Sequence, residues 1–261
     1  MKSNLVVVAP DEVVAAARAA ETDGEEASNL SKVSKALGRY LFYGPGVLIL
    51  DGAEALAAWV KARQNGVNVT QISASEASDF TFPPGHPRDG VLYVAHPATS
   101  GVYFTVASFH RLAFEHKFSE AVDLLMHLGA TEIKVKHVQG WSREFAAKMA
   151  GPLSATEVDI QVSSQKANAS SLLYEAHLEG NTQPRIPDSL VWYQHEPTWQ
   201  SIAKGRIEFG LTEFSLTVNY EDDFGVNAGL KLNAGKAGLD LGGTFEDHQA
   251  TTWQIHGKFA K

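Results

Sequence analysis

The feature that most constrains the fold is a change of hydrophobic period along the chain. In residues 114–128, apolar side chains recur at steps of three and four residues, the spacing of one face of an α-helix. From Pro152 onward the period changes to two, which is typical of strands with one buried face, as in the alternating residues Leu172, Tyr174, Ala176 and Leu178. The sequence therefore predicts an α+β protein.

Three successive regions are expected from this change of period. Residues 1–43 are predicted to be an N-terminal helical segment that packs against a mixed α/β layer in residues 44–151. Residues 152–261 are predicted to be an antiparallel β region with one helix at 197–210, because Pro197 suits a first helical turn. No proline follows Pro197, so the strands after it can form uninterrupted ladders, in a sheet continuous with that of the α/β layer.

Four runs near the end of the chain are expected to form an antiparallel meander. They are Phe214–Tyr220, Val226–Ala234, Leu239–Phe245 and Thr251–Phe259, joined by short polar or glycine-bearing links. The second and third runs would make an amphipathic hairpin whose apolar face carries Val226, Ala228, Leu230, Leu232, Leu239, Leu241 and Phe245. Such a hairpin fits a sheet with one face in water, and it also fits a strand pair that inserts into a membrane.

Composition excludes several classes of protein. A net charge of −8 disfavours nucleic acid as the main partner. The chain has no cysteine, so disulfides, cysteine-bound zinc and thiol nucleophiles are impossible. Residues 1–10 hold no apolar run long enough for a secretory signal peptide, so the expected compartment is the cytoplasm. No run of about 18 apolar residues exists that could make a transmembrane helix.

Local catalytic and cofactor motifs fail when they are tested against the sequence. Gly235-Lys236 follows Gly229 by one residue too many for a phosphate-binding loop. His195-Glu196 opens like a helical zinc site, but Trp199 stands where the second histidine is required. We therefore expect no cofactor and no metal.

One polar stripe has ligand-like spacing. His116, Glu120, Asp123 and His127 fall on a single face of the helix predicted before Gly129. Two imidazoles and two carboxylates on one face can bind a divalent ion or transfer protons. The alternative is a solvated polar face with weak pairs between successive turns.

Aromatic residues gather around the start of the predicted helix at 197–210. Trp192, Tyr193 and Trp199 form a candidate partner surface. The alternative is that Trp192 and Trp199 cover the edge of the sheet core where the helix begins.

The first functional hypothesis is a non-enzymatic binding or self-assembly protein that uses its C-terminal β-sheet. The run Thr251–Phe259 is the expected open edge, and the partner is another protein or a second copy in a homo-oligomer. One alternative is an oligomeric pore-forming or membrane-perturbing effector that inserts the hairpin at 226–245. Another alternative is an enzyme with a composite histidine and glutamate site in the α/β layer, drawn from His96, His110, His116 and Glu120.

Overall fold

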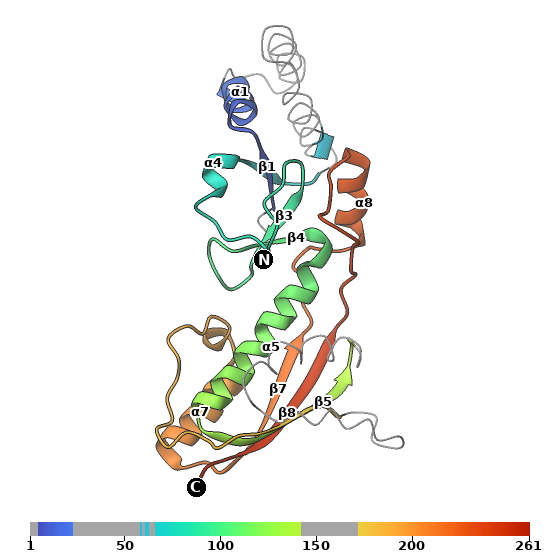
Figure 1. The fold of residues 1–261 in the computed structure, drawn as a ribbon. Helices are drawn as coiled ribbons and strands as arrows, with labels where there is room; N and C mark the ends of the chain where they lie inside the picture. The colour runs from blue at the N-terminus through green and yellow to red at the C-terminus, as the bar shows by residue number, and fades with distance from the viewer. Residues whose placement is uncertain (1–4, 23–57, 59–60, 63–65, 142–171) are drawn as a thin grey trace. The chain divides into compact units, whose positions relative to one another are not determined.

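A computed structural model describes residues 5–22, 58, 61–62, 66–141 and 172–261. Along the chain the helices and strands are β1 (Leu5–Ala9), α1 (Asp11–Thr22), β2 (Val69–Ser73), α4 (Ala74–Ala77), β3 (Leu92–Ala95), β4 (Tyr103–Thr105), η1 (Val106–Ser108), α5 (Phe109–His127), β5 (Ala130–Gln139), β6 (Leu172–His177), η2 (Tyr193–His195), α7 (Pro197–Phe209), β7 (Glu213–Tyr220), α8 (Ala228–Ala237) and β8 (Thr251–Phe259). Helices accompany two mostly antiparallel sheets, which confirms the α+β class (Figure 1).

The chain divides into two compact units that each combine distant segments. The first unit contains the chain up to Leu112 together with Asp223–His248, and the second contains Ala113–Asp222 with Gln249–Lys261. Both boundaries of the predicted three-part division, at 43/44 and 151/152, lie outside the described residues. That division therefore stays a prediction.

The first unit is built on a four-stranded sheet with the order β2-β1-β3-β4. Strand β1 is parallel to β2 and antiparallel to β3. One face carries Leu5 and Val7 and packs with residues of α1 and α8. The other face carries Val6, Val8 and Tyr93 and is covered by phenylalanines of the segment that follows α4.

Strand β1 was not expected within the N-terminal segment, which the sequence predicted to be helical. All five residues of Leu5–Ala9 are buried, so both faces of the strand lie in the core. A strand buried on both faces is a continuous apolar run without alternation, and periodicity cannot distinguish it from a buried helical turn. Helix α1, which begins at Asp11, lies within the segment that the sequence predicted to be helical.

The strand predicted at Val226–Ala234 is wrong, because this segment contains helix α8. The Asn227 side chain accepts hydrogen bonds from the N–H groups of Gly229 and Leu230 at 3.0 and 3.2 Å, which caps the helix start. Gly238 ends the helix in a left-handed conformation, with φ of 85°. Leu230, Ala234 and Ala237 are buried at helical spacing, and Leu232 is 57% exposed.

The amphipathic hairpin at 226–245 is therefore absent. Alternation would bury Ala228 and Leu232, and both are exposed. Leu239 is buried, whereas Leu241 and Phe245 are partly buried against the same core as α8. The third predicted run, Leu239–Phe245, forms only an isolated bridge between Asp240 and Val91. The membrane-inserting alternative loses the strand pattern on which it rested.

The second unit contains an antiparallel sheet with the order β6-β5-β8-β7, so β8 lies between β5 and β7 (Figure 1). Its apolar face is covered by α5, whose Phe114 and Phe118 rings meet the Trp253 ring edge-on at centroid distances of 4.8 and 5.0 Å. Helix α7 packs against β7, and it matches the helix predicted at 197–210 within one residue. No pairing between described strands joins this sheet to the first, so the predicted continuity of one sheet is not confirmed.

Two glycines make opposite predictions for stability. At Gly257 in β8 an added methyl group would overlap the Glu132 carbonyl oxygen, so Gly257→Ala should lower the free energy of unfolding by about 1–3 kcal/mol. At Gly235 in α8 nothing lies within 4 Å of the added group. Gly235→Ala should raise the free energy of unfolding by about 0.5–1 kcal/mol, because glycine loses more conformational entropy in a helix.

Urea unfolding followed by circular dichroism measures both changes. Equal effects of the two substitutions would contradict the close approach of β5 and β8 at Gly257.

Candidate functional site

The polar stripe on α5 contains a carboxylate that is buried. Glu120 is 7% exposed, and its two oxygens accept hydrogen bonds from the backbone N–H groups of Val191 and Tyr193, each at 2.8 Å. A buried carboxylate is costly unless donors compensate its charge, and bonds of this kind are stronger than neutral ones. Glu120 therefore anchors the loop that leads into η2.

Lys117 is a second buried charge on α5, and the predicted stripe did not include it. Its ammonium group pairs with the Glu196 carboxylate, donates to the Asn219 carbonyl oxygen at 2.7 Å, and lies 5.1 Å from the centre of the Trp192 ring. The spacing in the sequence could have indicated its burial, because Lys117 lies four residues from the buried Ala113 and Ala121 and therefore on the same side of the helix. A lysine on the buried side of a helix needs an acceptor nearby.

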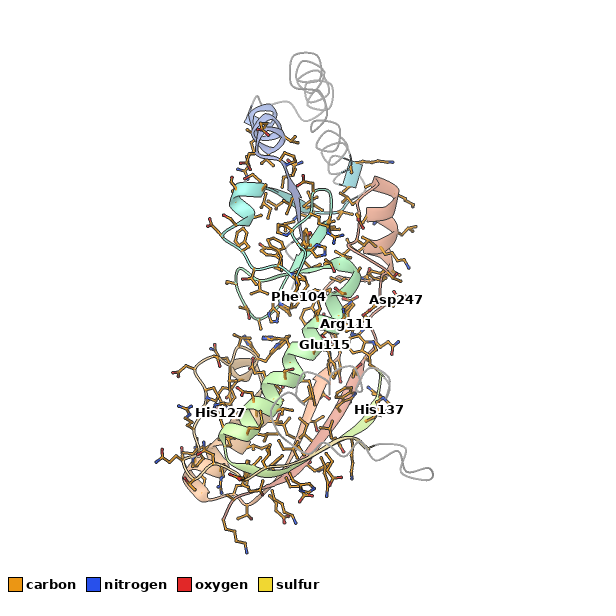
Figure 2. The ribbon with its side chains drawn as sticks, viewed as in Figure 1. Phe104, Arg111, Glu115, His127, His137 and Asp247 are labelled. Carbon is orange, nitrogen blue, oxygen red and sulfur yellow. The ribbon has the colours of Figure 1, made fainter. Side chains whose placement is uncertain are left out.

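The other members of the stripe divide into two local contacts. The Trp192 Nε1–H donates to His116 Nδ1 at 3.1 Å, and burial lowers the His116 pKa, which favours the neutral ring that this bond requires. His127 lies in the last turn of α5 (Figure 2). Its Nδ1 is 3.0 Å from the Asp123 carbonyl oxygen and 3.2 Å from Asp123 Oδ1. Within the described residues no group of three or more histidine, aspartate or glutamate side chains could hold a metal ion. The stripe anchors a loop at one end and forms a pair between successive turns at the other.

The candidate aromatic surface is mostly interior. Trp199 is fully buried and Trp192 is 6% exposed, whereas Tyr193 is partly exposed. The two indoles therefore pack in the core of the second unit, which is the alternative that the sequence left open.

The remaining residues of the composite-site hypothesis also make structural hydrogen bonds. In the first unit the buried His110 donates its Nε2–H to the Val226 carbonyl oxygen at 2.5 Å. His96 Nδ1 accepts from the N–H of Ala98 at 3.1 Å. Each of these hydrogen bonds selects one tautomer of the imidazole ring and holds the ring to the backbone.

Strand β7 presents the feature that the sequence did not reveal. The Phe259 N–H donates to the Thr212 carbonyl oxygen at 2.9 Å, and the register with β8 runs without a bulge from Glu213 to Tyr220. The backbone N–H and C=O groups of an antiparallel strand point alternately to its two sides, so those of the even-numbered residues of β7 point toward β8. The N–H and C=O groups of Glu213, Ser215, Thr217 and Asn219 therefore point away from the sheet.

This side of β7 is open in the part of the chain that the structure describes. No described strand pairs with it, and only the Asn219 carbonyl has a partner there, the Lys117 ammonium group. The outward backbone groups of Glu213, Ser215 and Thr217, over a stretch of five residues, have no hydrogen-bonding partner among the residues that the structure describes.

The expected open edge at Thr251–Phe259 is wrong, because β8 pairs on both sides. Its partners are β5 and β7, and its side chains Trp253 and Ile255 are buried in the sheet centre. A strand near the end of the sequence can occupy a central position because strand order depends on tertiary pairing and not on chain order.

The polar face of the second sheet adjoins the β7 edge. Glu132, Lys258 and Glu213 lie opposite one another on adjacent strands, and the next row contains Lys134, His256 and Ser215. A shallow hollow of about 450 Å³ lies among these side chains, above Gly257. Because opposite charges alternate across the face, it does not form the single-sign patch that a polyanion requires.

A second polar cluster lies in the first unit, where β1 and β2 end. Arg18 makes two hydrogen bonds to the Glu76 carboxylate, at 2.7 and 2.9 Å, and Glu76 caps α4 by accepting from the Ser73 N–H at 2.9 Å. The Asp11 carboxylate accepts from the Ser75 N–H at 3.0 Å. The Arg18 side chain and the Ser73 N–H hold the pKa of Glu76 at about 2. These groups satisfy one another, so the cluster fixes α4 against α1.

Comparison with protein-family models, with curated proteins and with solved structures finds no match for this chain. Among the described residues, no helix is both long enough and apolar enough to cross a membrane.

Glu120 should be the main anchor of the loop at 190–193. Glu120→Gln replaces one accepting oxygen by an NH₂ group that faces a backbone N–H, so we expect the free energy of unfolding to fall by about 1.5–3 kcal/mol. The matched control is Asp123→Asn, because that carboxylate is 39% exposed, and it should cost less than about 1 kcal/mol. Urea unfolding followed by tryptophan fluorescence measures both, and an equal or smaller loss for Glu120→Gln would contradict the anchor.

The ion pair between Arg18 and Glu76 should contribute to the free energy of unfolding at neutral pH and not in acid. The pKa of Glu76 is lowered from 4.5 to about 2, so its contribution is fully present above pH 4.5 and is lost as the pH falls toward 2. Glu76→Gln should cost less than about 1 kcal/mol at pH 7, because both side chains are largely exposed, and the difference should vanish near pH 2.

Thermal unfolding by circular dichroism at pH 7, 4 and 2 tests this dependence. Glu208→Gln removes the same charge from an exposed helical position and serves as the control. A cost of Glu76→Gln that does not change with pH would contradict the assignment.

Proposed function

We propose that this protein is a non-enzymatic binding or assembly protein that takes up an extended protein segment at the free edge of β7. The observation that carries the proposal is the row of outward backbone groups at Glu213, Ser215 and Thr217, which have no partner among the described residues. An added strand would satisfy these groups, as in other cases of β-strand addition.

The side chains of β7 can supply specificity beside the backbone bonds. Phe214, Leu216 and Val218 lie on the buried face, whereas Ser215 and Thr217 lie on the polar face. An incoming strand with alternating apolar and polar residues would match both faces in one register. Each backbone hydrogen bond contributes about 0.5–1.5 kcal/mol, so a short edge can support moderate affinity.

Strand β7 lacks most devices that keep an edge from pairing. Soluble proteins protect long edges with proline, bulges or several charged side chains. Strand β7 has no proline and no bulge in its pairing with β8, and Glu213 is its single charged residue. Such an edge is expected to be covered by a partner in use.

The class of partner follows from charge and composition. The net charge of −8 and the alternating charges of the sheet face disfavour a polyanion, so the proposed partner is a protein. The proposal takes the cytoplasm as the site of action, which the cysteine-free composition permits.

Peptide selection tests the proposal directly. A displayed library of ten-residue peptides with alternating polar and apolar residues is selected on the immobilised full chain, and the selected peptides are synthesised for titration. We expect bound peptides to protect the amides of Ser215 and Thr217 from hydrogen exchange. Thr217→Pro should weaken binding at least about tenfold, because it removes an outward N–H without breaking the ladder to β8.

The control is Thr217→Ala, which keeps the backbone N–H and should change affinity by less than about threefold. Circular dichroism verifies that both variants fold. A library without binders, or binders that are insensitive to Thr217→Pro, would contradict the proposal.

A further inference from the structure

We infer that the segment received by β7 is β7 of a second copy, paired antiparallel about a two-fold axis that passes beside Leu216. This inference rests on the proposed function, since it names the partner of the same edge. A closed two-fold contact uses one surface on both subunits, and it would join two four-stranded sheets into one of eight strands.

The outward backbone groups of β7 belong to every second residue, and this restricts how two β7 strands can pair edge to edge. The outward N–H and C=O groups belong to odd-numbered residues, so each odd residue of one copy must lie opposite an odd residue of the other. Even-numbered side chains lie on the buried face, so this rule also keeps the two apolar faces on the same side. Registers that pair odd with even residues satisfy neither condition.

Among the allowed two-fold registers, charge and length favour the one centred on Leu216. A register centred on Thr217 places Glu213 of one copy opposite Glu221 of the other, and like charges directly opposite are unfavourable. A register centred on Ser215 pairs only residues 213–217 within β7. The register centred on Leu216 pairs residues 213–219 and opposes no like charges.

The pairs formed in this register are chemically compatible. On the polar face Ser215 lies opposite Thr217, and on the apolar face Phe214 lies opposite Val218. Glu213 of one copy lies opposite the uncharged Asn219 of the other, so this pair opposes no like charges. The Asn219 carbonyl oxygen has two lone pairs, so it can accept from Lys117 and from an incoming N–H together.

The contact should be reversible on dilution. One strand pair of this length buries less area than the roughly 1,200 Å² typical of stable interfaces. The fraction of chains in the dimer is therefore expected to rise as the protein concentration increases from about 1 µM to about 1 mM, and the dimer should dissociate below that range.

Disulfide trapping tests both the partner and the register, because the natural chain has no cysteine to interfere. Ser215→Cys and Thr217→Cys are made as separate variants. Facing residues in an antiparallel pair have Cα atoms about 5.5 Å apart, within the range that a disulfide spans. Under mild oxidation an equimolar mixture of the two variants should give a covalent dimer containing one chain of each.

Each variant alone reports a different register. If Ser215→Cys alone forms a covalent dimer efficiently, the register is centred on Ser215. If Thr217→Cys alone does so, the register is centred on Thr217. Either result overturns the inference. Gln254→Cys, on the same face of the interior strand β8, is the control and should stay monomeric. Thr217→Pro should abolish the concentration-dependent dimer in sedimentation equilibrium.

The outcome separates this inference from the proposed function. A chain that stays monomeric at about 1 mM and gives no mixed disulfide overturns the second copy as partner. If library peptides still bind at Ser215 and Thr217 in that case, strand addition holds and the partner is a different protein. If no peptide binds either, both proposals fail.

Discussion

The second sheet depends on the insertion of β8 between β5 and β7. This strand supplies hydrogen-bonding partners to both neighbouring strands. It also places Trp253 against the phenylalanines of α5, so the pairing and the apolar core of this unit both depend on it. Gly257 permits the closest approach to β5, because any side chain there would meet the Glu132 carbonyl. With β8 in the centre, β7 is the outer strand of this sheet among the described strands.

The same unit uses buried charge to hold irregular backbone in place. Glu120 accepts from the N–H of Val191 in the loop before η2 and from that of Tyr193 at the start of η2. Lys117 binds Glu196 and the Asn219 carbonyl. Ions buried without such partners would destabilise the fold by several kcal/mol, so their positions tie α5 to both the loop and the end of β7. Lys117 thereby links the helix that covers the apolar face to the backbone of the proposed binding edge.

Local patterns in the sequence predicted those elements whose signal is local. Helix α5 follows from its apolar period, and α7 follows from Pro197 and the spacing of Trp199 and Ala203. Helix α8 was missed because its apolar residues also fit alternation, although the cap at Asn227 and the stop at Gly238 were readable. The polar stripe was predicted as a group, but burial of Glu120 depends on a loop about 70 residues away in sequence, which spacing along one helix cannot reveal. The β7 edge could not be predicted, since strand order arises from contacts that no local pattern encodes.

The central position of β8 also has a consequence for biosynthesis. During translation β5, β6 and β7 leave the ribosome before β8, so among the described strands β7 has no pairing partner until β8 arrives, and β5 has only β6. A nascent chain that stops short of Thr251 would display β5 and β7, each with one apolar face, without the strand that pairs with both. Such intermediates are aggregation-prone. The arrangement makes completion of this sheet a late event in the life of the polypeptide, because its contacts join segments that are far apart in sequence.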